Sequence, residues 1–511
     1  KENGKLDPAL TVRLEFANRP SSERIFHITP AESIEMKRAS LGVRMPTTTT
    51  LEGLEQLETF MEWSKRRLAM VENLHLSPAP HLKRLKVGTW VSLATRVGQG
   101  NGGKEMADIT YRVLEALGIN MPSVFGIDDA VAGEMMKRYG TIGTTWTAWA
   151  ANGDVVNNFD GQFAFKAGET PVQRWQRLLD DMYRSGADRV KKEQPNVFDA
   201  SIHINLGDEI GQIANANILV RTPQGMAYFH DWLKQHGQNP EALGAKSWDE
   251  VKPLGDRSGI ANEEGTPKAR LFYWTRQFIN DCSAQYYRCG TMAVKKYFPK
   301  AQIIAVNYQA APMGAAFIGN GNDMDNETLD FFHFGRVGAF DGVMMEDWVD
   351  GCDLGVGAEN LAAEMMRAAA RKHNSPLACY LVGGEAIRGE FYGFLMHGIK
   401  EIGLYLYGPI SNIGPAWGED PRALKELAEV TREVKKFEDA IADGVIPPRK
   451  AALLVATTSD YMQNRGIRFC GERQTLYVAL QHAYLPLDVV CEEDIVEDNI
   501  LKNYDLLYVT D

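Results

Sequence analysis

Segments with the polarity pattern of strands and segments with the periodicity of helices alternate eight times between residues 86 and 445. This alternation favours a parallel sheet, because each connection between parallel strands needs a crossover that is usually a helix. Eight strand–helix units are the number that closes such a sheet into a barrel. The sequence therefore predicts an α/β fold whose central part, residues 86–445, is a (β/α)8 TIM barrel.

The region before the barrel, residues 1–85, does not continue this alternation. Two short segments with strand-like alternation, Thr11–Phe16 and Arg24–Ile28, precede a helical pattern over Leu51–Asn73. This order predicts a β-rich accessory region that is followed by a helical connector.

The region after the barrel, residues 446–511, begins a new pattern behind a Pro-Pro pair. Strand patterns over Ala451–Ala456, Leu487–Val490 and Leu506–Val509 enclose a helical pattern over Glu472–Ala483. The pattern is typical of the start of a flavodoxin-like domain. Because three parallel strands leave an unpaired edge and a small core, we expect this domain to be partial in the chain.

The composition excludes several classes of partner. The formal net charge is −12, whereas nucleic acids and anionic membranes are bound by basic surfaces. No run of about 18 apolar residues is present, so we expect no membrane-spanning helix. The six cysteines form no CxxC pair, which disfavours a structural zinc site; Cys282 and Cys289 are either bridged or free. The compartment stays open between secreted or periplasmic and cytoplasmic.

Two of the predicted barrel strands lead to a glutamate. Residues 201–206 alternate in polarity and are followed by glycine, aspartate and Glu209, and residues 377–382 are followed by two glycines and Glu385. These are the fourth and seventh strands along the chain, and the carboxyl ends of barrel strands meet at one face. Cleavage of a glycosidic bond needs such a pair of carboxyl groups. The alternative for each glutamate is a solvated loop position.

The two glutamates suit a retaining mechanism. Glu209 would be the general acid and Glu385 the nucleophile, with carboxyl groups about 5–5.5 Å apart; an inverting enzyme needs about 6.5–9.5 Å. Glu390 competes with Glu385 for the nucleophile role, although an acid is also favoured at a helix start. Asp208 has three open uses: binding a sugar hydroxyl, holding the proton of Glu209 by like charge, or capping a helix.

Polar and aromatic residues at other predicted strand ends are candidates for substrate binding. Asn307 and Tyr308 end the fifth strand, where a tyrosine can bond the nucleophile. Asp347 and Trp348 end the sixth strand, where the carboxylate can bind hydroxyls and the indole can stack on a sugar face. Two further stacking candidates, for which core packing is the alternative, are Trp146 and Trp417.

Other conspicuous residues favour structural roles. His203 lies inside the fourth strand, and we expect it to be a satisfied core residue. Asp128 and Asp129 follow the second strand, where a turn is favoured over a pair that binds hydroxyls or a cation. Residues 320–326 lack the full calcium-loop pattern, and residues 98–103 lack the Lys-Ser/Thr of a phosphate loop. We therefore expect no metal and no organic cofactor.

Several stretches resemble, in order, those of glycoside hydrolase family 42. Members of this family are β-galactosidases whose barrel is followed by a glutamine-amidotransferase-like trimerisation domain. Residues 204–211 resemble the family's acid/base strand, and Glu385 falls where its nucleophile lies. Three further stretches resemble the fifth strand, the following helix with the sixth strand, and the approach to the eighth strand; they are residues 298–308, 329–348 and 397–405. Residues 472–511 resemble the trimerisation domain.

The resemblance implies a glycoside hydrolase that cleaves O-glycosyl bonds of a carbohydrate substrate by double displacement, without a cofactor, and that forms homo-oligomers. Three features depart from the family. Asp208 stands where the clan usually has an asparagine, the stretch from Glu385 to His397 is shorter, and the metal-binding cysteine cluster is absent. We expect a distant relative, with sugar identity and exo or endo action left open. The rivals are a transglycosylase and a non-catalytic carbohydrate-binding or assembly protein on a decayed barrel.

Overall fold

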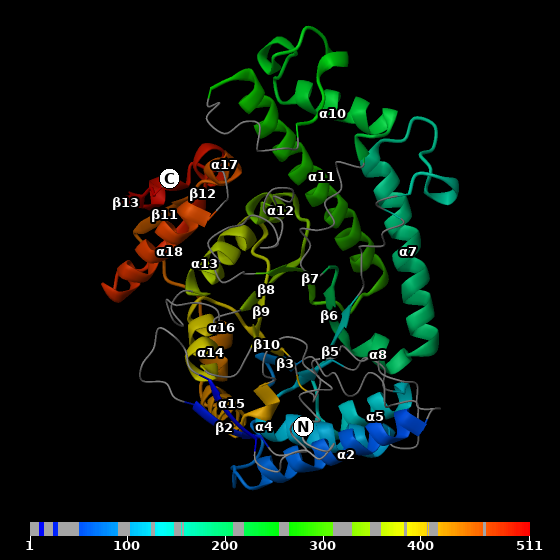
Figure 1. Ribbon diagram of the computed structural model, residues 1–511, viewed down its shortest axis with the longest axis vertical. Coiled ribbons are helices and arrows are strands. Elements are labelled where there is room, and N and C mark those ends of the chain that lie inside the picture. Colours follow the sequence, from blue (N-terminus) through cyan, green and yellow to red (C-terminus); the bar gives the residue numbers. More distant parts are fainter. Residues whose placement is uncertain are drawn as a thin grey trace.

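In the computed structural model, the described residues of the chain form three separate sheets (Figure 1). It has an antiparallel pair of strands near the N-terminus, an eight-stranded parallel sheet, and a three-stranded parallel sheet near the C-terminus. The residues that the structure describes are 10–14, 24–28, 51–89, 103–123, 128–147, 155, 158–207, 219–254, 265–309, 330–347, 359–382, 386–405, 407, 417–462 and 467–510.

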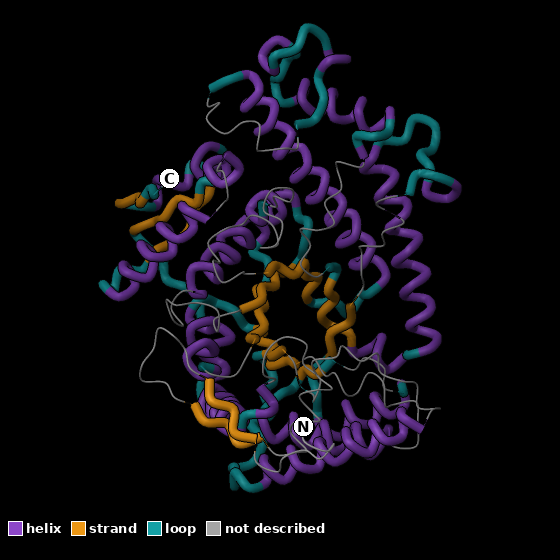
Figure 2. The backbone as a smooth tube through the Cα atoms, in the orientation of Figure 1, coloured by secondary structure: helices purple, strands orange, loops and turns teal. Residues whose placement is uncertain are grey.

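The eight parallel strands form a ring (Figure 2). In chain order they are β3 (Lys86–Thr89), β4 (Met121–Pro122), β5 (Thr144–Thr147), β6 (Ser201–Asn205), β7 (Ile303–Gln309), β8 (Gly342–Asp347), β9 (Leu377–Val382) and β10 (Glu401–Tyr405). Their order in the sheet is β4-β3-β10-β9-β8-β7-β6-β5. The predicted (β/α)8 barrel is thereby confirmed.

Among the described residues, two hydrogen bonds join β4 and β5, the two ends of this sheet, and close the ring. The N–H of Ile142 donates to the carbonyl of Asn120 at 2.9 Å, and the hydroxyl of Thr144 donates to the carbonyl of Pro122 at 2.8 Å. Proline has no N–H to offer a neighbouring strand. The threonine side chain therefore supplies one of the links that join the last strand to the first.

Each barrel strand leads into a helix that covers the outside of the ring (Figure 1). The helix after β6 is preceded by an additional helix, α10 (Pro223–Gln235), which packs against α7 and α11. The eight covering helices are α4 (Gly103–Leu117), α5 (Asp129–Tyr139), α7 (Pro171–Glu193), α11 (Pro267–Tyr297), α12 (Phe331–Val337), α13 (Glu359–Ala370), α14 (Ile387–Met396) and α15 (Pro421–Lys435).

Alternate strand residues belong to two different cores. Ile303 and Ala305 of β7 pack with Met344 of β8 in a small cluster. Ile304 and Met345, the alternate positions of the same strands, belong to the large core that includes the covering helices. Successive strand side chains point to opposite faces, so both faces of this sheet are apolar. This explains why β7 and β8 begin in the sequence as nearly continuous apolar runs.

The N-terminal elements agree with the sequence prediction in type. β1 (Leu10–Leu14) and β2 (Arg24–Ile28) form an antiparallel pair, and α2 (Leu51–Glu72) follows. α2 packs against α4 and α15, and its Trp63 is buried. The helical connector is therefore attached directly to the outer helices of the barrel.

The eighth strand includes a charged residue at its start. The apolar pattern of the sequence begins only at Gly403, whereas β10 begins at Glu401. Glu401 is buried, and a charged residue breaks the apolar pattern by which a buried strand is recognised. The charge of Glu401 therefore obscures the start of this strand in the sequence. Its partners lie on other strands of the barrel.

The C-terminal strands β11 (Ala451–Val455), β12 (Leu487–Cys491) and β13 (Leu506–Tyr508) form a parallel sheet in the order β12-β11-β13. These strands were predicted. Three helices accompany them: α17 (Thr457–Met462), α18 (Ile467–His482) and α19 (Glu492–Val496). We call residues 451–510 the C-terminal unit. Its strand β12 packs against α13 of the barrel, so the unit is docked on the barrel (Figure 1).

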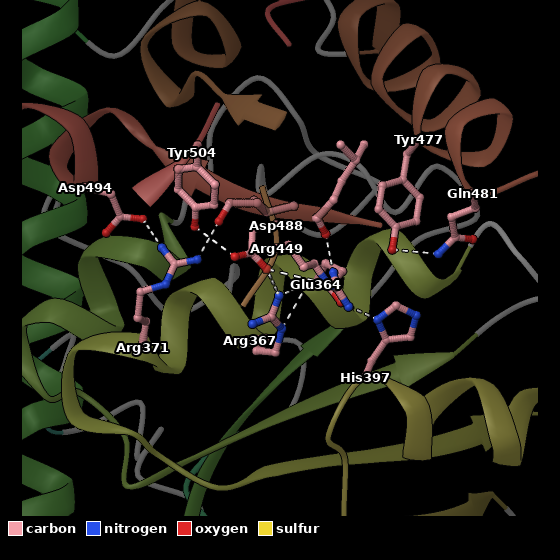
Figure 3. A network of polar contacts seen from close by, with 12 residues as sticks. Glu364, Arg367, Arg371, His397, Arg449, Tyr477, Gln481, Asp488, Asp494 and Tyr504 are labelled. Carbon is pink, nitrogen blue, oxygen red and sulfur yellow. Dashed lines mark hydrogen bonds and ion pairs between the residues drawn. The ribbon is translucent and has the colours of Figure 1, made fainter. Parts of the chain in front are cut away.

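A network of charged side chains joins the barrel to the C-terminal unit around Glu364 of α13 (Figure 3). Glu364 is 0% exposed. Its carboxylate accepts a hydrogen bond from Arg367 at 2.9 Å, pairs with Arg449 at 2.7 Å and bonds the ring of His397. Burial raises the pKa of Glu364, but His397 and the two arginines lower it, to about 2. The carboxylate therefore stays ionised in the core.

Replacement of Glu364 by glutamine should destabilise the protein by about 3 kcal/mol near neutral pH, because it leaves buried cations without their partner. Urea unfolding measures this loss. Asp181→Asn is the matched control, since Asp181 pairs with Arg184 on an exposed helix surface and such pairs contribute less than about 1 kcal/mol. Equal effects of the two changes would contradict the structural role given to Glu364.

Candidate active site

The two candidate catalytic glutamates follow the fourth and seventh strands of the ring. β6 ends at Asn205, four residues before Glu209, and β9 ends at Val382, three residues before Glu385. The strands from β6 to β9 are parallel, so their carboxyl ends open on one face of the barrel. The predicted strand positions are confirmed, whereas Glu209, Glu385 and the neighbouring Asp208 lie outside the described residues.

Hydrogen bonds fix the backbone after β6 as far as Gly207, the residue before Asp208. The N–H of Leu206 donates to the carbonyl of Ala305 in β7 at 2.8 Å. The side-chain oxygen of Asn205 accepts from the N–H of Gly207 at 3.2 Å, a bond to the backbone two residues ahead that turns the chain. The segment that carries the candidate acid thus leaves from a fixed position on the rim.

Backbone pairing places the other candidate residues in the strands of the ring. Asn307 and Tyr308 of β7 pair with β8, and Asp347, the last residue of β8, pairs with β9. Trp146 of β5 pairs with β6. Trp348 and the side chains of the other four residues lie outside the part of the chain that the structure describes. Their substrate contacts stay predictions.

Trp417, also considered for sugar stacking, is 1% exposed and packs in the core. Its indole lies against Tyr407, with ring centroids 5.5 Å apart, and Tyr407 meets Trp63 of α2 edge-on at 5.2 Å. These three rings connect α2 to the chain that follows β10. Core packing, the alternative weighed from the sequence, therefore describes Trp417.

A turn was predicted at Asp128 and Asp129, but the two residues begin the helix α5 (Asp129–Tyr139). Asp128 caps α5 by accepting from the N–H of Ala130 at 3.0 Å. Asp129 accepts from the side chain of Asn196 at 2.8 Å and so joins α5 to α8 (Pro195–Ala200). Both carboxylates are engaged within the protein.

Three charged or ionisable side chains meet inside the barrel. Glu401, the first residue of β10, pairs with Lys86 of β3 at 3.1 Å and with the ring of His203 in β6. Three strands separate β6 from β10 in the ring, so the contact with His203 crosses the barrel interior. His203 is a buried core residue with a polar partner, as predicted, but the sequence did not identify the partner.

The charge of Glu401 is maintained by its neighbours. Burial raises the pKa of this carboxyl, but the positive charge of His203, the hydrogen bond between them and the charge of Lys86 lower it, to about 2. The contact links strands that are 198 residues apart in the chain. The one sequence signal for this group was a charged residue at the start of each of two otherwise apolar strands, Lys86 in β3 and Glu401 in β10.

The described residues contain no group of three or more His, Cys, Asp or Glu side chains arranged to hold a metal ion. Cys282 and Cys289 are both free and buried, which resolves the alternatives left by the sequence. Burial raises the pKa of the Cys289 thiol to about 11, so this thiol stays neutral. Within the described ranges, no helix is long and apolar enough to cross a membrane.

No protein-family model matches the chain, and no curated protein matches it in sequence. Solved structures do match. The β-galactosidase of the psychrophilic Marinomonas ef1 has 12% identity and a TM-score of 0.58, over 83% of this chain and 72% of that chain. The β-galactosidase of the Antarctic haloarchaeon Halorubrum lacusprofundi has 12% identity and a TM-score of 0.58, over 83% and 69%.

A third match is a catalytic mutant of a family 42 β-galactosidase from G. stearothermophilus. It has 13% identity and a TM-score of 0.55, over 84% of this chain and 68% of that chain. At such identities the likeness establishes a common fold and not a common activity. It confirms, at the level of the fold, the distant resemblance to family 42 barrels that the sequence indicated.

Glu401→Gln should lower the free energy of unfolding by about 3 kcal/mol near pH 7, because Lys86 loses its buried partner. A carboxyl with a lowered pKa stabilises the folded state above its ordinary value of 4.5 and loses that contribution as the pH falls toward about 2. The difference between wild type and variant should therefore shrink in acid.

Urea unfolding at about pH 7 and about pH 3 measures this difference. Glu72→Gln is the control, because Glu72 forms an exposed pair with Arg112 and should change stability by less than about 1 kcal/mol. A gap between wild type and Glu401→Gln that stays constant with pH would rule out the assigned ion pairs.

Proposed function

We propose that the protein is a retaining glycoside hydrolase in which Glu209 is the general acid/base and Glu385 the nucleophile. The observation that carries the proposal is topological. The fourth and seventh strands of a closed parallel barrel run into the segments that hold these two residues. The common fold with β-galactosidases supports the reaction class.

In this mechanism Glu209 donates its proton to the glycosidic oxygen while the carboxylate of Glu385 attacks the anomeric carbon. The bond to the leaving group breaks and a glycosyl ester of Glu385 forms. Glu209, now ionised, removes a proton from water, and the water oxygen displaces Glu385. Glu209 is protonated again and Glu385 is an anion again, so both groups are restored after each turnover.

The position of α14 supports the choice of Glu385 as the anion. Glu385 precedes Ile387, the first residue of this helix, by two positions, and the positive end of a helix favours a nearby carboxylate. The rival, Glu390, lies in the first turn of the same helix and is buried. We give Glu390 a structural role in the helix.

Substrate binding is proposed for the residues on the remaining strand ends. Asp208, Asn307, Tyr308 and Asp347 would bind sugar hydroxyls, with Tyr308 bonding the nucleophile. Aromatic residues would stack on the sugar faces, namely Trp146 and Trp348. Because the Trp417 indole is enclosed, the proposal gives it no stacking role.

Glu209→Gln and Glu385→Gln should each reduce turnover at least ~10³-fold on the true substrate, the scale of losing an acid, base or nucleophile. A screen of aryl glycosides and natural oligosaccharides with product chromatography finds the substrate and its stereochemical outcome. Glu390→Gln, checked for folding, is the matched variant and should keep its activity. Near-normal turnover by either of the first two variants would remove that residue from the mechanism.

A mechanism-based fluoro-sugar probe distinguishes the enzyme from its non-catalytic rival. Covalent labelling at Glu385, located by peptide mass spectrometry, supports double displacement. Sugar binding without labelling or turnover, across all sugar types, would favour a carbohydrate-binding or assembly protein. Products that depend on an added sugar acceptor would point to the transglycosylase instead.

We also propose that the chain divides into an accessory region with a helical connector over residues 1–85, a catalytic barrel over 86–445 and a partial flavodoxin-like domain over 446–511.

The last domain, residues 446–511, would serve homo-oligomer assembly. Its strand β13 lies at the edge of the sheet, where Leu506 is 46% exposed and the following Val509 is 57% exposed. Sedimentation of the full chain should give the mass of an oligomer, and a monomer throughout would contradict this role.

A further inference from the structure

A second group of ionisable side chains lies where the C-terminal unit meets the barrel. The barrel contributes Asp281 from α11, Asp330 immediately before α12 and His333 within α12, and the C-terminal unit contributes Glu493 from α19. The charge of Glu493 acts on both Asp330 and His333. The proposed reaction uses none of these residues.

Asp330 is the most enclosed member of this group, at 1% exposed. One carboxyl oxygen, Oδ1, caps α12 by accepting from the N–H of His333 at 3.1 Å, and the backbone N–H of Asp330 donates to the side chain of Asn280 at 2.8 Å. The other oxygen, Oδ2, has no hydrogen-bond partner in the described structure, and the same holds for the buried Oε2 of Glu493. Burial of an ionised carboxylate without partners is costly.

The imidazole of His333, in the helix that Asp330 caps, is already engaged by another carboxylate. The ring of His333 bonds Oδ1 of Asp281 at 2.9 Å, and the indole of Trp232 donates to the other oxygen of Asp281 at 2.9 Å. Burial lowers the pKa of His333, but the hydrogen bond and the charge of Asp281 raise it above its ordinary value. Burial raises the pKa of Asp281, but His333 lowers it below its ordinary value. The two residues form an ion pair, and the charge of His333 offsets only part of the rise in the pKa of Asp330 that burial and the charge of Glu493 cause.

Other ionisable groups of the junction are engaged with partners of their own. Glu492 accepts hydrogen bonds from Thr458, and Asp494 is bound by Arg336 and Arg371. Two further groups have pKa values that burial raises above the ordinary range and so stay neutral: the thiol of Cys491 in β12 and the hydroxyl of Tyr273 in α11.

We propose that the junction between barrel and C-terminal unit is a pH-sensitive contact, held closed while the buried carboxyl of Asp330 is protonated and loosened when it ionises. One negative charge across the contact is tolerated beside the Asp281–His333 pair. A second adds repulsion between the helix that Asp330 caps and the helix that holds Glu493.

The direction of the pH response follows from the carboxyl of Asp330. Burial, together with the charge of Glu493, raises the pKa of Asp330 from 3.8 to about 7. A carboxyl with a raised pKa contributes its full stabilisation below its unfolded value and loses it as the pH rises through the folded value. The contact therefore weakens between about pH 4 and pH 7. His333 acts in the same direction only above its ordinary pKa of 6.5.

Amide hydrogen exchange of the full chain at about pH 5 and about pH 6.5 tests the proposal below the range of His333. After correction for the intrinsic exchange rate, opening of peptides from β11 to α19 should become about tenfold more frequent at the higher pH, as expected for a tenfold change in the opening equilibrium. Peptides from α4, on the far side of the barrel core, provide the internal reference and should not respond.

Asp330→Asn is the matched variant, because asparagine caps helices as well as aspartate does but cannot ionise. Its C-terminal unit should open equally often at both pH values. Glu493→Gln removes the facing charge without altering the cap of α12 and should also reduce the response. The proposal is overturned if both variants keep the wild-type response, if the wild type has none, or if the barrel peptides respond equally.

Discussion

The closure of the eight-stranded parallel sheet is the constraint on which the rest of the structure depends. An open parallel sheet of this size would leave two edges with unpaired backbone groups. Here the edges meet at β4 and β5, where β4 has only two residues, one of which is Pro122. The hydroxyl of Thr144 bonds the proline carbonyl. Because the ring closes, all eight carboxyl ends open at one mouth, including those before Glu209 and Glu385.

Two fully enclosed carboxylates connect parts of the barrel that are remote in sequence. Glu401 lies inside the ring and pairs with Lys86 and His203, whereas Glu364 lies outside it and pairs with Arg367, Arg449 and the ring of His397. A buried ion pair contributes little net stability compared with apolar packing, but the loss of one partner is costly. Such pairs therefore penalise arrangements in which the strands and helices are shifted.

Charges of opposite sign orient the C-terminal unit on the barrel. At this contact the barrel helices α12 and α13 and the turn after α13 present cations, and the C-terminal unit presents carboxylates. Figure 3 shows part of this set, namely Arg367, Arg371, Asp488 and Asp494. The pairs join Arg336 to Asp494, Glu497 and Asp498, Arg367 to Asp488, Arg371 to Asp494, and Lys372 to Asp498. Against this complementary surface, Asp330 and Glu493 each have a buried carboxyl oxygen without a hydrogen-bond partner in the described structure, which makes the protonation of Asp330 the sensitive element.

Local patterns determined the fold class. Strand alternation, helix periodicity and the glutamates that follow two strands can all be recognised within a few residues of sequence. The sequence thus determined the number of strand–helix units and the fourth and seventh positions of the strands that lead to Glu209 and Glu385. Only the tertiary structure decided that Trp417 is enclosed, that β10 starts at Glu401, and that His203 and Glu364 have the partners they do. These outcomes depend on burial and on contacts between distant segments, which no local pattern encodes.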